Sequence, residues 1–490
     1  MLSRRKFIAA SGATLALSLV SPKKASAQSL RLRRDLTTMA PNDLFFQQYA
    51  EAIARMHQLP ERDPRSWRNQ AIIHANFCPH GTLDFLQWHR HYLTFFEQIC
   101  GQLIGEPNFA LAYWNWSNRR GRIPEPFFAD NPLNVEFWND PSNYNSSNWG
   151  PINTVGIRGL TENIGVQDFR GGDVFTEDEI ERIRRNSNFN LFSAELEGTP
   201  HNLGHVLLGA TNSSPPFGHM YNGLSPLDPI FWLHHCNVDR IWAEWQAAGN
   251  TTPSNSTEYN RQFVNAEGDL VRVTANDARD FTAMGFTYET TLSDLTSPIV
   301  LTLEGTELDA PLGFLPEFFA SADVGVQELG KADNTEVSQV DTATSISVQA
   351  NNLLTNLFGS HTFRTNSFLG TPRIAVEGDR ILAVLKNITP PSATDDAIVV
   401  EIFVNCPYLS ATTPSNDPHY AGTFSFFGQH KQGMGKPEFV IDITDPLRYL
   451  AEKGLLVDNL VNIQLLPLAV VPEGRKQASF KVETIEIIRA

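Results

Sequence analysis

The chain has 490 residues and a formal net charge of −16 at pH 7, from 38 Lys and Arg against 54 Asp and Glu. Such an acidic chain repels phosphate groups, which argues against nucleic acid or an anionic membrane surface as a partner. Its length allows two or three domains of about 150 residues each. Only four cysteines are present, with no Cys-x-x-Cys pair, so no disulfide framework is predicted.

Residues 1–27 have the features of an export signal. Arg4 and Arg5 precede an apolar run at 7–20, and the small residues Ala25, Ser26 and Ala27 follow it. This order is typical of a twin-arginine signal peptide. The apolar run has 14 residues, whereas a membrane-spanning helix needs about 20. We therefore expect a protein without a stable membrane anchor, in the periplasm or outside the cell.

The next segment is predicted to be helical. The stretch FLQWHRHYLTFFEQICGQLI at 85–104 keeps its apolar residues at helical spacing, and so do the stretches at 176–189 and 231–245. All nine tryptophans lie between Trp67 and Trp245, as expected for one large core. We expect a mainly α-helical domain over residues 28–290.

The second half of the chain has a different composition. Residues 291–345 are rich in Ser, Thr, Asp and Ala and are predicted to form a linker. Short runs dense in β-branched residues follow, such as ILAVLKNI, AIVVEIFVN and FKVETIEII. Their spacing predicts a β-sandwich or barrel over residues 346–490, and the expected fold class is an α+β multidomain protein.

The histidines are concentrated in the predicted helical domain. Residues 74–92 read HANFCPHGTLDFLQWHRHY and contain four of the thirteen histidines and one of the four cysteines. A lone histidine in an apolar stretch is usually a hydrogen-bonded core residue. Four histidines in nineteen residues favour a ligand role instead. A second cluster lies in PHNLGHVLLG at 200–209 and LDPIFWLHHCNVDRIWAEW at 227–245.

The second cluster has the spacing of a metal site. His201 and His205 are four residues apart, so on a helix they project from one face, as two ligands of one ion must. His235 and Asp239 repeat that spacing. We expect Asp239 to accept a hydrogen bond from a ligating imidazole and so fix its tautomer.

The first cluster offers His74, His80 and His89 as a matching set. His89 lies in a predicted helix, and the other two lie before it. Imidazole binds copper, zinc, iron and nickel, and a ligand set without carboxylate or thiolate favours copper or zinc. Two such sets favour a binuclear centre.

These motifs are long enough to carry a resemblance. The chain contains W-x-x-Q-A-x-I-H-x-x-x-C-x-H, F-x-x-W-H-R-x-x-L-x-x-x-E, L-E-x-x-P-H-N-x-x-H and D-P-I-F-W-L-H-H-C-N-V-D-R, in that order. This series resembles the tyrosinase, catechol oxidase and haemocyanin family of type 3 copper proteins. The segment at 271–289 resembles the end of the catalytic domain of plant polyphenol oxidases, and VVEIFVN with HYAGTFSFFG resembles their C-terminal domain.

The resemblance implies a four-helix bundle around two copper ions, called copper A and copper B. It assigns three histidines to each ion: His74, His80 and His89 to copper A, and His201, His205 and His235 to copper B. His234 is expected to pack beside the ligands, since it lies about 100° around the helix from His235. His91 is expected on the surface.

Three further residues take roles through the same resemblance. Cys78, two residues before His80, matches a family element in which the sulfur forms a thioether with the second copper A ligand; the alternative is a buried free thiol. Glu197 and Asn202 match a pair that holds a water able to accept a phenol proton. Taken alone, a glutamate near a helix start is more often a cap or dipole partner. The other cysteines are expected to be small buried apolar residues: Cys100, Cys236 and Cys406.

The sequence therefore predicts an exported binuclear copper polyphenol oxidase. It would use O2 to hydroxylate monophenols and to oxidise o-diphenols to o-quinones, with small phenols and O2 as its partners. The alternatives are a catechol oxidase restricted to diphenols, a haemocyanin-like O2 carrier, and a binuclear zinc hydrolase, which would commonly need carboxylate ligands. The C-terminal β domain would be either a lid over the coppers or a stability module. The oligomeric state does not follow from the sequence.

Overall fold

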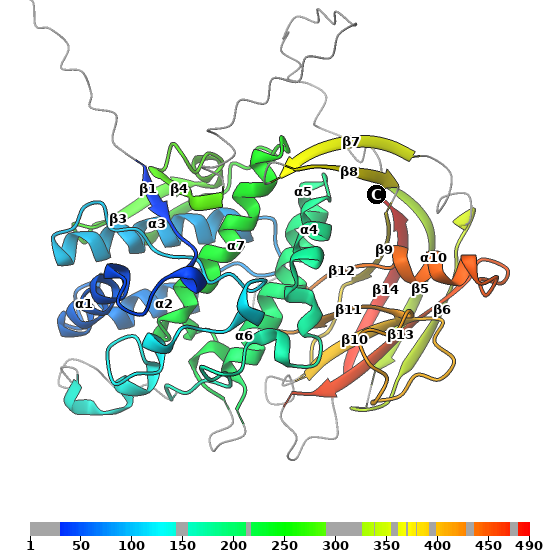
Figure 1. The fold of residues 1–490 in the computed structure, drawn as a ribbon, viewed down its shortest axis with the longest axis horizontal. Coiled ribbons are helices and arrows are strands. Elements are labelled where there is room, and N and C mark those ends of the chain that lie inside the picture. Colours follow the sequence, from blue (N-terminus) through cyan, green and yellow to red (C-terminus); the bar gives the residue numbers. More distant parts are fainter. Residues whose placement is uncertain are drawn as a thin grey trace, which may run out of the picture.

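The computed structural model describes residues 30–143, 155–211, 217–290, 326–337, 339–353, 361–368, 371–378, 380–391, 398–427, 436–470 and 479–490. They form a helical domain and a β domain that lie side by side (Figure 1). The predicted signal peptide and residues 291–325 of the predicted linker lie outside this range. None of the helices described there is both long and apolar enough to cross a membrane.

The helical domain contains seven of the described α-helices: α1 (Leu44–Gln58), α2 (Trp67–Phe77), α3 (Phe85–Ile104), α4 (Glu177–Arg184), α5 (Phe189–Leu196), α6 (Asn202–Gly209) and α7 (Ile230–Ala247). Local signals explain their ends. Ser66 accepts a hydrogen bond from Asn69 N at the start of α2, and Gly105 ends α3 in the left-handed conformation with φ 77°. Helix α7 is buried along nearly its whole length, which explains why apolar residues occupy every face.

A π-helical turn interrupts the helix that carries two of the histidines. Helix α5 continues into the π-helix η9 (Glu197–His201), which contains Pro200, and then into α6. Proline has no N–H to donate, so the usual ladder cannot run through this turn. π-turns often occur at functional sites.

The strands of the described residues lie in two four-stranded sheets and three two-stranded ones. The large sheets have the orders β11-β10-β13-β6 and β12-β9-β14-β5, and the small ones are β1-β4, β2-β3 and β7-β8. The strand bounds are β1 (Arg31–Arg33), β2 (Glu258–Val264), β3 (Leu270–Thr274), β4 (Phe286–Tyr288), β5 (Gln327–Val337), β6 (Thr344–Gln349), β7 (His361–Phe368), β8 (Thr371–Gly378), β9 (Ile381–Lys386), β10 (Ile398–Val404), β11 (Tyr420–Ser425), β12 (Phe439–Asp442), β13 (Leu460–Ala469) and β14 (Phe480–Arg489). Helix α10 (Thr444–Glu452) lies in the same domain.

The β domain is a sandwich of its two four-stranded sheets, because the strands described there do not close into a barrel. The apolar residues of both sheets form one core between them. The predicted boundary at residue 346 is wrong: strand β5 pairs with β14 and belongs to the domain, although it lies within the predicted linker.

Strand β10 is buried on both faces, which explains its nearly continuous apolar sequence IVVEIFV. Val400 and Ile402 point into the sandwich core, whereas Val399 and Phe403 join the core of the helical domain. Glu401 shares the second face and pairs with Arg170 of the helical domain, with an Oε2 to Nη2 distance of 2.5 Å. The outer face of this sheet is therefore docked on the helices.

A buried network of charged side chains links α3 to α7. Arg33, on strand β1, is fully buried and donates to Glu97 of α3 and to Asp239 of α7. Arg90 of α3 donates from Nε to Asp239 Oδ1 at 2.5 Å, and the hydroxyl of Tyr288 on β4 donates to Asp239 Oδ2. Breaking one partner of a buried network of this kind costs about 3–5 kcal/mol of stability.

Candidate metal centre

Two groups of imidazoles face each other inside the helical domain. One contains three histidines and a cysteine, and the other contains four histidines: His74, Cys78, His80 and His89, then His201, His205, His234 and His235. Within each group the possible ligand atoms lie within 4.8 Å of one another. The groups meet where the rings of His89 and His235 stack, with centroids 4.2 Å apart and planes 9° apart.

Four helical segments and one loop supply the six predicted ligands. Helix α2 carries His74, α3 carries His89, α7 carries His235, and the π-helix and α6 together carry the pair His201 and His205. The sixth, His80, lies in the loop between α2 and α3. Their exposures are 2% or less, so water does not compete with a metal for these rings.

Oxygen atoms hold the Nδ1 side of four of the rings. The pairs are His74 with Gly223 O at 2.8 Å, His89 with Phe85 O at 2.8 Å, His205 with Met220 O at 3.0 Å, and His201 with Asn202 Oδ1 at 2.9 Å. A ring that donates from Nδ1 is in the tautomer whose Nε2 carries a lone pair. All four rings are thus oriented for binding a metal through Nε2.

The copper B group shows the fit most directly. His201 Nε2 is buried and has no hydrogen-bond partner. His205 Nε2 and His235 Nε2 lie 3.2 Å apart, which is about the separation of two nitrogens bound to one ion at roughly 2.0 Å in tetrahedral geometry. Three convergent imidazole nitrogens without a nearby carboxylate suit copper or zinc.

Burial keeps these imidazoles neutral, which is the form that binds metals. Burial lowers the pKa of His201 to about 3, although its hydrogen bond to Asn202 opposes the shift. Burial also holds the pKa values of His205 and His235 well below the usual range for histidine, and the neighbouring histidines add to the effect. Protons therefore compete weakly with a metal at neutral pH.

Cys78 lies beside two of the predicted copper A ligands. Its Sγ is 3.5 Å from His80 Nδ1 and 3.6 Å from His80 Nε2, and it is 3.3 Å from His89 Nε2. Nearly equal distances to the two nitrogens of one ring place the sulfur close to the plane that bisects them, and this plane contains Cε1. The three other cysteines are buried, as predicted: Cys100, Cys236 and Cys406.

The structure brings the two predicted proton-handling residues to the same centre. Glu197 is 3% exposed, and its Oε1 accepts a hydrogen bond from Gly81 N at 2.6 Å. Burial raises the pKa of Glu197 to about 8, and the Gly81 amide opposes this shift. Asn202 is fully buried, accepts from His201, and donates from Nδ2 to Ser425 O of the β domain at 3.2 Å.

One residue at the centre was not predicted from the sequence. Phe427 follows β11, and its ring stacks on His205 with centroids 3.7 Å apart and planes 6° apart. The same ring meets His80 edge to face, at 5.5 Å and 88°. The phenylalanine-rich sequence TFSFF was the only local signal, and it does not show which ring reaches the histidines.

Two sequence predictions need correction. Asp239 accepts from Arg33, Arg90 and Tyr288, and no hydrogen bond to an imidazole is among its described contacts; carbonyl and amide oxygens orient the rings instead. His91 was expected on the surface, but it is 2% exposed and its Nε2 contacts Thr274 O at 2.9 Å.

His234 lies among the ligands, as its position beside His235 on α7 requires. Its ring packs between Trp116 and His201, with centroid distances of 5.0 and 5.4 Å. A side chain at Gly204 would meet this ring at 2.5 Å, so the absence of a Cβ there gives the ring its space. The packing role of His234 stays a prediction, since its ring also belongs to the group of possible ligands.

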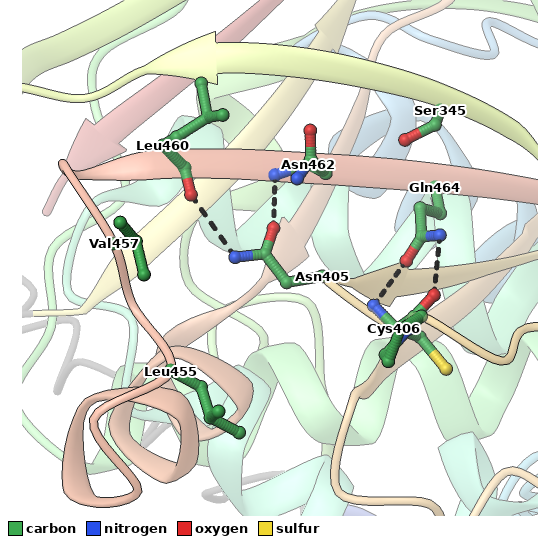
Figure 2. A pocket seen from close by; sticks show the side chains of 9 residues that line it. Ser345, Asn405, Cys406, Leu455, Val457, Leu460, Asn462 and Gln464 are labelled. Atoms are coloured by element: carbon green, nitrogen blue, oxygen red, sulfur yellow. Dashed lines mark hydrogen bonds between the residues drawn. The ribbon is translucent and has the colours of Figure 1, made fainter.

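A separate cavity of about 360 Å³ opens on the β domain, and Figure 2 shows its lining. Gln464 and Cys406 exchange two hydrogen bonds there, and Asn405 bonds to both Leu460 O and Asn462 N. No histidine or carboxylate lines it. The geometry therefore places the metal chemistry in the helical domain.

Comparison with known proteins agrees with this placement. Residues 47–248 match the family described as the common central domain of tyrosinase. Over these residues the chain is similar to the tyrosinase family. Members of this family are dicopper oxidoreductases, and both histidine groups described above lie within the matched residues.

Relatives of the tyrosinase family match different lengths of the chain. Chloroplastic polyphenol oxidase of Malus domestica is 29% identical over 286 residues, which cover 51% of this chain and 47% of the relative. Tyrosinase HcTyr1 of Hahella sp. (strain CCB-MM4) is 24% identical over 483 residues, which cover 86% and 92%. The chain thus spans about half the length of the plant relatives it matches, and most of the bacterial one.

Solved structures show that the two-domain fold is shared. Latent apple tyrosinase aligns with a TM-score of 0.56 and 21% identity, covering 94% of this chain and 98% of that one. Latent aurone synthase aligns with a TM-score of 0.58 and 20% identity, covering 95% and 90%. The helical core with its C-terminal sheet domain, as predicted, is confirmed.

Replacing one ligand should remove one metal ion from each chain. We expect His89→Ala to empty copper A and His205→Ala to empty copper B, because two imidazoles hold an ion far less well than three. Metal analysis after copper loading should give one ion in each variant and two in the parent. His91→Ala is the matched control and should keep both; full copper in either ligand variant would contradict the assignment.

Proposed function

We propose that this chain is a copper polyphenol oxidase that uses O2 to hydroxylate monophenols and to oxidise o-diphenols to o-quinones. The observation that carries the proposal is the pair of facing imidazole groups, each buried and without a carboxylate ligand. Copper bound there would supply the redox chemistry with O2. His74, His80 and His89 would hold copper A, and His201, His205 and His235 would hold copper B.

Hydroxylation also needs a group that takes up the phenol proton. A free phenol with a pKa near 10 is almost fully protonated at neutral pH. Glu197 lies one turn before His201, and its second carboxylate oxygen is not used in the bond to Gly81. Burial raises its pKa to about 8, so the carboxylate form that accepts a proton becomes more populated as the pH rises toward 8. We assign proton uptake to Glu197, through a water held with Asn202.

Catechol oxidation without hydroxylation is the second candidate. Its support is that the Asn202 amide donates to Ser425 O, so one N–H of this amide is engaged by the β domain. An O2 carrier like haemocyanin would use the same imidazoles but would turn over no phenol. Copper stoichiometry together with turnover of tyramine and dopamine separates all three functions.

Loss of the proton-handling pair should affect hydroxylation more than oxidation. We expect Asn202→Gly and Glu197→Gln to lower tyramine turnover much more than dopamine turnover, with copper content unchanged, because only a monophenol needs both deprotonation and oxygen insertion. Steady-state rates on both substrates measure this. Asn163→Gly, at an exposed loop position, serves as the control. An equal fall on both substrates would refute the assignment.

We also propose a thioether between Cys78 Sγ and His80 Cε1. The sulfur lies nearly equally far from both ring nitrogens, as an approach to the carbon between them requires. Forming the C–S bond removes the thiol and ring hydrogens, with O2 as the oxidant.

The thioether should be visible by mass. Copper-loaded protein exposed to O2 should be lighter than its sequence predicts by two hydrogen atoms, whereas Cys78→Ser should show no loss. Intact mass and peptide mapping measure both. Cys100→Ser, at another buried cysteine, is the control and should keep the loss. Alkylation of Cys78 after copper loading would exclude the bond.

The β domain is proposed to act as a lid. The ring of Phe427 covers His205 and meets His80, so it lies where a phenol would approach the coppers. Arg170 and Glu401 help to hold the sheet in this position. The full-length protein would then be latent until the lid moves.

Shortening the covering side chain should activate the intact chain. We expect Phe427→Ala to raise dopamine turnover several-fold toward that of protein cut at a protease site engineered within 291–325, because the ring no longer fills the space over His205. Tyr408→Ala, at an exposed position of the same domain, should have no effect. Unchanged turnover in both Phe427→Ala and the cut protein would favour a stability role for the domain.

Export by the twin-arginine route is part of the proposal. It rests on Arg4, Arg5 and the apolar run at 7–20, which lie outside the described residues. This route carries folded proteins, which is consistent with a metal centre that forms before export. Detection of mature protein beginning at Gln28 outside the cytoplasm would test it.

A further inference from the structure

The carboxylate of Glu197 connects the two halves of the metal centre. Glu197 begins the π-helix that ends at the copper B ligand His201. Its Oε1 accepts the N–H of Gly81 at 2.6 Å, and Gly81 directly follows the copper A ligand His80. A single side chain therefore joins the π-helix that leads to His201, called the copper B helix below, to the loop at 78–84 that carries His80, called the copper A loop.

The copper A loop depends on such attachments because no helix holds it. His80 is the only one of the six predicted ligands that lies outside a helix. The loop includes Gly81 in the left-handed conformation, with φ 65°, and its neighbour Leu83 is 49% exposed. The hydrogen bond from Gly81 to the buried Glu197 fixes the main chain one residue after the ligand.

We propose that Glu197 is a positioning residue for copper A: it holds the Gly81 amide and thereby sets where His80 lies relative to His74 and His89. The proposal rests on the proposed function only in that the six imidazoles hold two metal ions. A substitution of Glu197, which lies on the copper B helix, should therefore weaken the binding of the ion at copper A if it breaks the bond to Gly81. Removing a contact that orients a ligand typically costs 10–100-fold in metal affinity.

Two conservative substitutions separate this role from proton transfer. Glu197→Gln keeps an oxygen at the same reach, so it can still accept from Gly81 N but cannot take a proton. Glu197→Asp keeps the carboxylate but is shorter by one methylene, about 1.5 Å, so it no longer reaches the amide. If the length of the side chain is what matters, the Gln variant should keep the metal ion at copper A and the Asp variant should lose it. If the negative charge is what matters, the Asp variant should keep this ion and the Gln variant should lose it.

The experiment uses full-length apo-protein and Zn²⁺ alone, because zinc binds imidazoles without redox chemistry. Native mass spectrometry and competition with a chelator should give two tightly bound ions for the parent and for Glu197→Gln. In Glu197→Asp one ion should bind roughly tenfold or more weakly. Hydrogen exchange should locate the weaker site: zinc should slow exchange in residues 78–84 of the parent and the Gln variant, but not of the Asp variant. Glu162→Asp, in an exposed loop, is the matched control.

Each result of the zinc-binding experiment either supports or overturns the positioning role of Glu197. Selective weakening of one ion in Glu197→Asp, with copper B retained and exchange altered at 78–84, supports the proposal. Equal affinities in the Asp and Gln variants would overturn it. Loss of both ions, or of copper B alone, would also overturn it, because Glu197 would then only support its own helix. A parent that binds two ions but oxidises no phenol would refute the proposed function and leave this inference standing.

Discussion

Burying imidazole nitrogens without hydrogen-bond partners is the constraint on which this centre depends. A buried polar atom left unpaired costs about 1–3 kcal/mol, and His201 Nε2 is such an atom. His205 and His235 add two nitrogens that face each other at 3.2 Å. Two metal ions would satisfy these atoms together. His201 Nε2 and the facing nitrogens of His205 and His235 thus lie together at a place where a metal could pair them.

The same constraint explains how the rest of the core is arranged. Each oriented ring uses a neutral oxygen as its Nδ1 partner, such as Gly223 O for His74 and Met220 O for His205. A neutral partner fixes the tautomer without adding a charge beside the ion. Asp239 could have served, but its charge is balanced by Arg33 and Arg90 and is directed away from the rings. That network holds α3 and α7 together from outside the centre.

Local spacing predicted that His201 and His205 lie together, because ligands on one helix must repeat with its period. The i to i+4 pair of His201 and His205 is of this kind, and it survives the π-helical turn because the turn ends at His201. The same spacing placed Asp239 one turn after His235 but could not identify its partner. One of the two arginines that meet Asp239, Arg33, comes from a strand 206 residues earlier. A long-range partner of this kind leaves no local pattern.

The β domain shows the same limit. Runs of β-branched residues revealed its central strands, whereas strand β5, with the sequence QELGKADNTEV, has only one β-branched residue besides its threonine and lies at a sheet edge. Of its described side chains only Leu329 and Val337 are buried, so the strand resembles a linker in composition. The charge of Glu401 inside an apolar strand was a visible signal. Only the structure shows that its partner is Arg170 of the helical domain.

The proposed lid role would link access to the metal centre with the state of Asn202. Ser425 and Phe427 are two residues apart, and they reach different parts of the same ligand group: Ser425 O accepts from the Asn202 amide, and the Phe427 ring covers His205. Because one short segment makes both contacts, a movement of the sheet that withdrew Phe427 from His205 would also remove the Ser425 acceptor from the Asn202 amide. Under the proposed lid role, opening the site and releasing this amide would be one movement.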